Sequence, residues 1–316
     1  MHRTLLVSLL ALACTGNAAD VYPTRPVRLI APFAPGGGLD ATARMIAQRL
    51  TSVLGQPVVV DNRPGVDSIV GTAIAAKANP DGHTLLMINM SHAINPALGK
   101  PLPYDSLKDF APVTQTNNQQ LLLVVIPSLP AKTVKELINL LKAKPGALSY
   151  GSSSNAVALP MELFKSMTGT ELVHIPYKGG GPMLNDMLGG QIQVAFGASI
   201  TTLPLVTAGR LRALAIGDSR RSALMPDLPT VSEAGVPGYH AVIWNGILAP
   251  AKTPPGVIAR LNQEIVDIVR AAEFRARLAS VGSEVMGSTP AQWGKFIETE
   301  IAKWTKIARL AGIKPD

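Results

Sequence analysis

Short apolar runs alternate with segments of helical spacing along the first third of the chain. Residues 26–33 and 58–60 are apolar and predict strands, whereas residues 40–54 carry apolar side chains three and four positions apart and predict a helix. A helix over 69–77 and a strand over 84–88 continue the series. Strands that alternate with helices favour a parallel sheet with helices on both faces.

The same alternation begins again after residue 120. Strands are expected over residues 121–126, 148–150, 171–175, 193–196 and 211–216, and helices over 134–144, 160–167 and after 177–182. The chain beyond Pro254 reads as helices. We therefore expect an α/β fold of two lobes, residues 20–120 and 121–235, with residues 236–316 returning as helices to complete the first lobe.

Residues 1–19 have the order of a secretory signal peptide, with a basic residue, an apolar run of about nine residues and a small-residue end. We expect cleavage near Ala18 or Ala19 and a periplasmic mature protein. The apolar run is shorter than the roughly 20 residues that span a bilayer. Cys14 raises the alternative of a lipid anchor, but Ala11 stands where a lipoprotein signal has leucine, so the sequence argues against anchoring.

Composition narrows the function classes. Hydrophobic residues make up 47% and charged residues 16% of the chain, which argues against disorder. Aromatic residues are scarce at 4%, which argues against a stacking surface for single-stranded nucleic acid. The net charge of +8 is spread along the chain, with only doublets such as Arg220-Arg221. We interpret it as a general field that favours anions, with no docking patch for nucleic acid or membrane.

A glycine-rich segment between the first strand and the first helix is the strongest local feature. Its glycines let the backbone approach a ligand, and the free N–H groups at a helix start favour an anion. Asp40 either caps the helix or accepts a hydrogen bond from the ligand. A turn that binds nothing is the alternative. The residues expected to bind a ligand here are Phe33, Ala34, Gly37, Gly38 and Asp40.

The same segment has a rival interpretation as a dinucleotide site. Gly36, Gly38 and Ala41 fit the pattern G-x-G-x-x-A, and Asp61 follows about 20 residues on, where a ribose-binding acid would lie. Against it, Asp40 would place a carboxylate beside the pyrophosphate. An exported dinucleotide-dependent oxidoreductase therefore stays as the alternative function.

A small polar loop in the expected second lobe corresponds to the glycine-rich segment of the first lobe. Ser152, Ser153, Ser154 and Asn155 follow a predicted strand and precede a helix, so hydroxyl and N–H groups there would hold the same anion from the opposite side. A solvated loop is the alternative. The pattern G-x-S-x-G of a serine nucleophile does not occur, and we expect no catalytic residue.

Four further residues are candidates for the walls of a site. Ser91 and His92 follow a predicted strand, and Tyr177 and Trp244 would line a cleft or simply pack in the interior. The histidines of the sequence lack the spacing of a metal site, so we expect neither metal nor cofactor.

Several sequence blocks, in order, resemble one family: the periplasmic solute-binding proteins of tripartite tricarboxylate transporters, also called the Bug family. The matching blocks are residues 22–26, 32–37 with Asp40, Ala43 and Arg44, 60–65, 80–82, 173–179, 210–215 and 228–235. Residues 66–68 and Ser154 depart from the family pattern, which leaves the identity of the ligand open.

The resemblance implies a type II periplasmic-binding-protein fold whose two lobes close on a small carboxylate-bearing organic acid. It implies that residues 33–40 and 152–155 hold the carboxylate, partly through water, and that Ala198 and Ser199 line the cleft. It further implies a monomer that delivers the acid to the membrane subunits of the transporter, without catalysis. A receptor that reports its ligand to a signalling partner is the remaining alternative.

Overall fold

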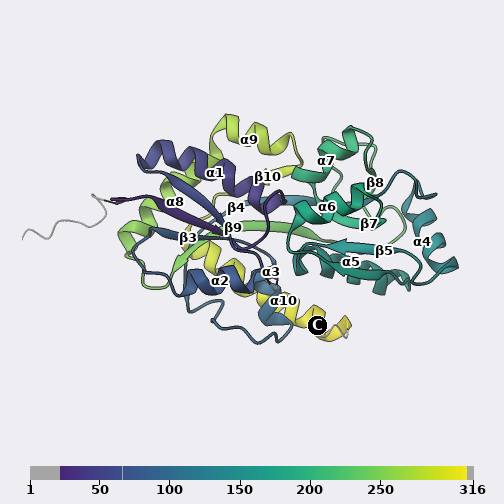
Figure 1. Cartoon of the computed structure of the whole chain (residues 1–316), viewed down its shortest axis with the longest axis horizontal. Helices are drawn as coiled ribbons and strands as arrows, with labels where there is room; N and C mark the ends of the chain where they lie inside the picture. The colour runs from purple at the N-terminus through teal and green to yellow at the C-terminus, as the bar shows by residue number, and fades with distance from the viewer. Residues whose placement is uncertain (1–21, 66, 312–316) are drawn as a thin grey trace, which may run out of the picture.

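The structure is a computed structural model that describes residues 22–65 and 67–311. The expected signal peptide and its cleavage site lie outside the described residues. A ten-stranded mixed sheet runs the length of the molecule in the order β2-β1-β3-β9-β4-β7-β5-β6, and β8 and β10 both pair with β4 (Figure 1). Among the helices of the described residues, none is long and apolar enough to cross a membrane.

One half of the molecule is built from the N-terminal and C-terminal parts of the chain (Figure 1). Its strands are β1 (Val27–Ala31), β2 (Val58–Asn62), β3 (Thr84–Asn89), β9 (Val242–Pro250), β10 (Ser283–Val285) and the first part of β4 (Phe110–Val125). Its helices are α1 (Gly38–Leu54), α2 (Ile69–Ala76), α3 (Ser91–Ala97), α8 (Pro255–Arg270), α9 (Ala272–Ala279) and α10 (Pro290–Ala311).

The other half is built from the middle of the chain. Its strands are β5 (Ser149–Ser152), β6 (Val173–Pro176), β7 (Val194–Ala198), β8 (Arg212–Ile216) and the end of β4. Its helices are α4 (Val134–Ala143), α5 (Asn155–Thr168), α6 (Gly180–Leu188) and α7 (Ser199–Thr207).

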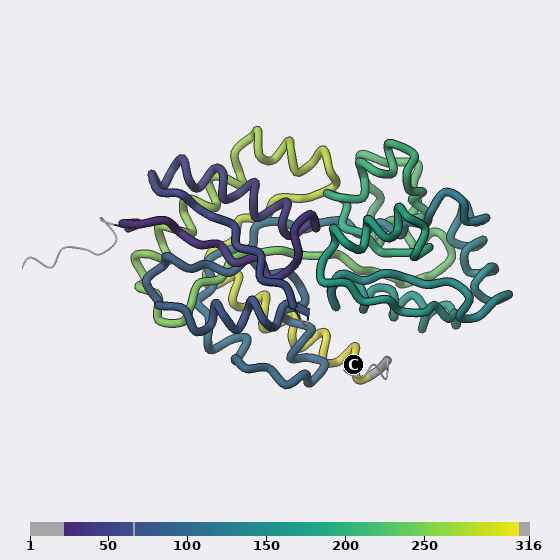
Figure 2. The backbone as a smooth tube through the Cα atoms, in the orientation of Figure 1, coloured from purple at the N-terminus to yellow at the C-terminus, as the bar shows by residue number. Residues whose placement is uncertain are grey.

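Strand β4 joins the two halves. Its residues 110–120 pair with β9, and its residues 121–125 pair with β7 and β8. The chain returns through the segment that leads into β9, so two adjacent chain segments cross between the halves, as Figure 2 shows. Each half has the same strand order, β2-β1-β3-β9-β4 in one and β6-β5-β7-β4-β8 in the other. This is the two-lobed α/β fold expected from the sequence.

Apolar packing on both faces of the sheet stabilises each half. Leu29, Ile46 and Leu261 bury β1, α1 and α8 against one another. On the opposite face, Trp293 of α10 is fully buried and packs edge-on against Trp244 of β9. At about 25 cal/mol per Å² of buried apolar surface, interior clusters of this kind supply the main stabilising term of the fold.

Strand β9 and the first part of β4 correct the sequence-based prediction. Residues 236–316 were expected to return as helices alone, yet they also contain β9 and β10. Residues 114–120 are buried or half-buried although all are polar. Most of their side chains bond to one another, to Thr42 of α1 or to Ser283 of β10, so the interior accommodates them without a hydrophobic pattern. The amide oxygen of Gln120 is buried without a hydrogen-bond partner.

Two helix starts also differ from expectation. Ser91 and His92 lie in helix α3 and not in a loop. Helix α5 begins at Asn155, five positions before the expected start at Pro160. Pro160 lies inside α5, beyond the first turn, so proline does not mark the start of this helix, and its missing N–H leaves one helical hydrogen bond unmade. Asn155, expected in a loop, is the first residue of α5, and Ser199 is the first residue of α7.

Candidate ligand-binding site

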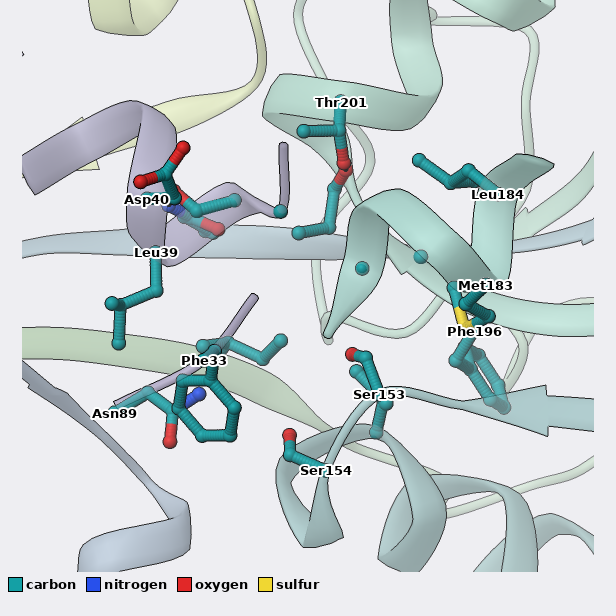
Figure 3. Close-up of a pocket in the computed structure, with 18 of the residues that line it drawn as sticks. Phe33, Leu39, Asp40, Asn89, Ser153, Ser154, Met183, Leu184, Phe196 and Thr201 are labelled. Carbon is teal, nitrogen blue, oxygen red and sulfur yellow. Dashed lines mark hydrogen bonds between the residues drawn. The ribbon is translucent and has the colours of Figure 1, made fainter. Parts of the chain in front are cut away.

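A small cavity lies between the two halves, where the strands β1, β3, β5 and β7 end. Its volume is about 40 Å³. Because one water needs roughly 10–15 Å³ by this measure, the cavity has room for a few water molecules or a compact group. Figure 3 shows side chains from both halves facing it. The lining residues are Phe33, Ala34, Gly37, Gly38, Leu39, Asp40, Asn89, Gln119, Ser153, Ser154, Val157, Gly180, Met183, Leu184, Phe196, Gly197, Ala198, Thr201, Ile243 and Asn245.

Four helices, α1, α5, α6 and α7, begin at this cavity. Their N-cap residues are Gly37, Ser154, Gly179 and Ala198, and none of the four makes a side-chain cap bond. The first N–H groups of a helix have no partner within the helix, and the helix dipole adds partial positive charge there. Four such ends around one cavity are an arrangement that favours an anion.

Two of the helices that begin elsewhere, α4 and α10, have side-chain caps, whereas the N-cap residues of α2, α3, α8 and α9 make none. In α4, Thr133 accepts a hydrogen bond from the N–H of Glu136. At the start of α10, Thr289 accepts from the N–H of Gln292, whose side chain accepts from the N–H of Thr289. These are reciprocal caps that use up free N–H groups. At the cavity the N-cap residues make no such bond, although in α5 the N–H of Ala156 donates to the Ser91 hydroxyl.

Asp40 is buried and its carboxylate is occupied. Oδ2 accepts from the backbone N–H of Gly36 and from Arg44 Nε, both at 3.0 Å, and Oδ1 accepts from Asn62 Nδ2 at 2.9 Å. Burial alone would raise the pKa of Asp40, but these hydrogen bonds outweigh it and hold that pKa below its usual value. In Figure 3 the carboxylate points away from Ser153 and Ser154. Asp40 therefore organises the β1–α1 loop (residues 32–37).

The β1–α1 loop packs backbone to backbone against the start of α6 in the other half. The N–H of Ala34 donates to the carbonyl of Lys178 at 3.0 Å. A Cβ on Gly179 would lie 2.8 Å from Ala34, and one on Gly181 would lie 2.4 Å from the carbonyl oxygen of Pro35. Only glycine allows this approach. The contact closes the cavity on one side.

Two further hydrogen bonds join the halves beside the cavity. The Ser91 hydroxyl of α3 accepts from the N–H of Ala156 in α5 at 3.1 Å. Asn155 Nδ2 donates to Asn95 Oδ1 at 2.9 Å. Ser91 and Asn155 were expected to bind ligand, and the structure places both in these contacts between α3 and α5, outside the cavity lining.

The cavity wall is neutral apart from Asp40. Among the residues that line it, all of which the structure describes, there is no lysine, arginine or histidine. The polar side chains are amides and hydroxyls, and Phe33, Met183 and Phe196 supply apolar surface. A bound anion would be held by neutral donors and helix ends.

The structure brings eight of the fifteen sequence-predicted site residues together at the cavity. They come from the β1–α1 loop and α1, from the loop before α5, and from the end of β7. They are Phe33, Ala34, Gly37, Gly38, Asp40, Ser153, Ser154 and Ala198. Their ligand contacts remain a prediction, since the cavity shows proximity only.

Five other predicted residues have interior or surface partners and lie outside the lining. His92 is buried, its Nε2 bonds to the carbonyl of Ser106, and burial lowers its pKa to about 4. Ser152 Oγ bonds to His174 Nε2 at 2.7 Å. The remaining hydroxyl and indole groups also have partners: Tyr177 with Asp186, Ser199 with the carbonyl of Gly282, and Trp244 with Glu300.

Sequence reasoning missed three amides of the wall: Asn89, Gln119 and Asn245. Asn89 directly follows a predicted strand. Polar side chains at the carboxyl ends of strands often line a ligand site, so this position was a usable signal. Gln119 lies in a polar stretch of β4 that has no hydrophobic pattern, and Asn245 is a single polar residue within the apolar run of β9. In the described part of the chain, no group of three or more His, Cys, Asp or Glu residues is placed to hold a metal ion.

Two α/β halves joined by crossing segments, with a cavity at their helix starts, define a periplasmic solute-binding protein. Within that class, the chain belongs to the receptor family of the tripartite tricarboxylate transporters. A family model described as "Tripartite tricarboxylate transporter family receptor" matches residues 42–313. This family consists of solute receptors and is not an enzyme family. The match confirms the expected family and the expectation that the chain is not an enzyme, and it excludes the oxidoreductase alternative.

Individual relatives agree with this assignment. Protein BugT of Bordetella pertussis is 37% identical over 322 residues, covering 99% of each chain. The structure of Rpa4515 of R. palustris with adipate is 37% identical, with a TM-score of 0.90, covering 93% of this chain and 100% of that one. MatC of Rhodopseudomonas palustris with bound malate is 28% identical, with a TM-score of 0.86, covering 90% and 99%.

Proposed function

We propose that this chain captures a small organic acid by its carboxylate between two lobes and delivers it to the membrane subunits of a tripartite tricarboxylate-type transporter. The observation that carries the proposal is the meeting at one cavity of four helix starts whose N-cap residues make no side-chain cap bond. Adipate and malate, which accompany two of the similar structures, are both dicarboxylates.

The magnitudes are sufficient for useful affinity. A hydrogen bond from a backbone N–H to a carboxylate contributes about 1.5–3 kcal/mol, and a helix dipole adds about 0.3–1 kcal/mol. Three or four such contacts supply much of the roughly 8 kcal/mol that micromolar binding requires.

In this proposal, one lobe consists of residues 20–120 and 236–316, and the other consists of residues 121–235. Closure is a rotation about the two crossing segments, at 120–121 and 241–242. Gly217 lies between them, since its N–H donates to the carbonyl of Leu121 and its carbonyl accepts from Ala241. Such a short hydrogen-bonded crossing allows rotation while it keeps the lobes in register. The cavity of about 40 Å³ is small, so an extended acid requires the lobes to separate before it enters.

The proposal includes periplasmic export by a signal peptide cut near Ala18 or Ala19, without a lipid anchor at Cys14, and a monomeric mature protein. N-terminal sequencing of the exported protein and light scattering test these two points. A mature N-terminus far from residue 19, or a dimer at micromolar concentration, would overturn them.

The direct test of the function is calorimetry of the purified mature protein against mono-, di- and tricarboxylates, with mass spectrometry of any acid carried through purification. We expect binding of at least one carboxylate and none of the matched amides. Binding of no carboxylate, or equal binding of acids and amides, would refute the carboxylate receptor.

A further inference from the structure

Three asparagines lie side by side beneath the cavity, on three adjacent strands. Asn89 of β3 pairs with Asn245 of β9, and Asn245 pairs with Asn117 of β4. Directly paired residues point to the same face of a sheet. All three are buried, and Asn245, which lines the cavity, is only 1% exposed.

The orientation of the Asn117 amide follows from a chain of hydrogen bonds. The Ser283 hydroxyl donates to the carbonyl of Asn118 at 2.8 Å, so its oxygen is free to accept from Asn117 Nδ2 at 2.7 Å. Asn117 Oδ1 then accepts from the Thr116 hydroxyl at 2.9 Å. The amide nitrogen of Asn245 must therefore face Asn117 Oδ1, as it does at 3.4 Å, because two facing carbonyl oxygens would repel.

This arrangement leaves the amide oxygen of Asn245 as an acceptor without a donor. It is buried and has no hydrogen-bond partner. Asn89, on the paired strand, uses its own amide oxygen to accept from the N–H of Ser91 at 2.9 Å, which fixes that side chain at the start of α3. A buried acceptor without a partner destabilises the closed form unless a ligand or water donates to it.

We propose that the bound acid carries a hydroxyl group that donates to Asn245 Oδ1, and that Asn245 sets a preference for hydroxy acids over their deoxy counterparts. This inference rests on the proposed function, because the helix ends hold the carboxylate while Asn245 accepts a hydrogen bond from a hydroxyl group on the carbon chain of the acid. A neutral hydroxyl fits better than an ammonium group. The carboxylate of Asp40, the one ionised side chain of the wall, is already occupied by three donors, so a buried ammonium would have no counter-ion from the protein.

The test compares acids that differ at one atom. One calorimetric series uses malate, 2-fluorosuccinate and succinate, and a second uses citrate and tricarballylate. Fluorine replaces the hydroxyl group but has no proton to donate, so the first series distinguishes hydrogen-bond donation from the effect of substituent size. We expect the hydroxy acid of whichever set binds to bind at least about tenfold more tightly than its deoxy and fluoro analogues, the scale of one buried acceptor left unpaired.

Variants assign the preference to Asn245. Asn245→Leu removes the acceptor, and we expect the ratio between hydroxy and deoxy acids to fall to within about twofold. The matched control is Asn118→Leu, one strand away on the opposite face, which should keep the wild-type ratio. Circular dichroism and thermal unfolding establish that each variant is folded.

The outcomes separate the two proposals. Equal affinity for hydroxy and deoxy acids in the wild-type protein, or a fluoro analogue that binds as well as malate, would overturn the role of Asn245 and leave the carboxylate receptor standing. Binding of none of the acids in the carboxylate panel would refute the receptor itself, and this inference with it. The wild-type comparison decides the matter even if Asn245→Leu does not fold.

Discussion

An alanine at Gly181 tests whether the contact between the β1–α1 loop and α6 belongs to the ligand-bound form. Gly181 lies in the first turn of α6, and its φ is outside the left-handed region, so alanine fits its backbone. In a helix, alanine is favoured over glycine by up to about 1 kcal/mol. The new Cβ would nevertheless lie 2.4 Å from the carbonyl oxygen of Pro35. The clash exists only when the lobes are closed.

The size of the effect follows from the geometry. An ordinary contact would need about 3.4 Å, so the loop has to withdraw by roughly 1 Å, and overpacking of this kind costs about 1–3 kcal/mol. That cost acts on the closed form alone. The apparent affinity for the acid should therefore fall by about 5- to 150-fold, while the unliganded protein unfolds at the same or a higher temperature.

The assay is calorimetry of wild type and Gly181→Ala with an acid that the wild type binds, together with thermal unfolding without ligand. Gly189→Ala is the matched control, because Gly189 is the C-cap residue of the same helix and its Cβ would meet only carbonyl oxygens at 3.5 and 3.6 Å. A folded Gly181→Ala protein with the wild-type Kd would refute the reasoning, since closure would then not require this contact.

Three further predictions concern charge and closure. Ser91→Ala removes the acceptor for the N–H of Ala156, so we expect the Kd measured by calorimetry to rise about fivefold with little change in the unliganded melting temperature; an unchanged Kd would contradict a role in closure. The folded-state pKa of Asp40 is lowered, so its carboxylate stabilises the fold above the unfolded-state pKa near 3.8, and that stability is lost as pH falls through the lower folded value. Asp40→Asn should therefore lower the free energy of unfolding at pH 7 by about 1 kcal/mol, and the difference from wild type should become smaller in acid. Denaturant titrations at both pH values measure this difference, and a difference that does not change with pH would argue against the stabilising role of the carboxylate. Raising NaCl from about 0.05 to 0.5 M should change the Kd by less than about threefold, because the cavity wall has no lysine or arginine to be screened; a tenfold loss would point to a cationic contact instead.

The elements that carry a hydrophobic period could be predicted from the sequence. The strand over 84–88 corresponds to β3, and the helix over 40–54 to α1, each within two residues at either end. The two loops expected to face each other, near Gly37 and Ser154, do line one cavity. This follows from topology, because loops after parallel strands gather at the carboxyl edge of the sheet.

The floor of the cavity could not be predicted in this way. Asn117 lies in a polar stretch of β4 that has no alternation of apolar and polar residues, and Asn245 is a single polar residue within the otherwise apolar β9. Their roles depend on which strands are neighbours, and that is set by tertiary structure. For the same reason, His92 and Trp244 were natural candidates for a site, yet both bond in the interior.

Neutral walls suit a receptor that must release its ligand. A lysine or arginine buried in the cavity would have to lose its hydration on closure, and its attraction to the acid would persist in a low-dielectric interior. Backbone N–H groups at helix ends are already part of the fold and carry only partial charge. When the lobes separate, water replaces the acid at these helix ends, so opening alone lowers the affinity for the acid without any change of protonation. The same argument leaves the choice between acids to the neutral acceptor of Asn245, whose hydrogen bond distinguishes ligands of equal charge.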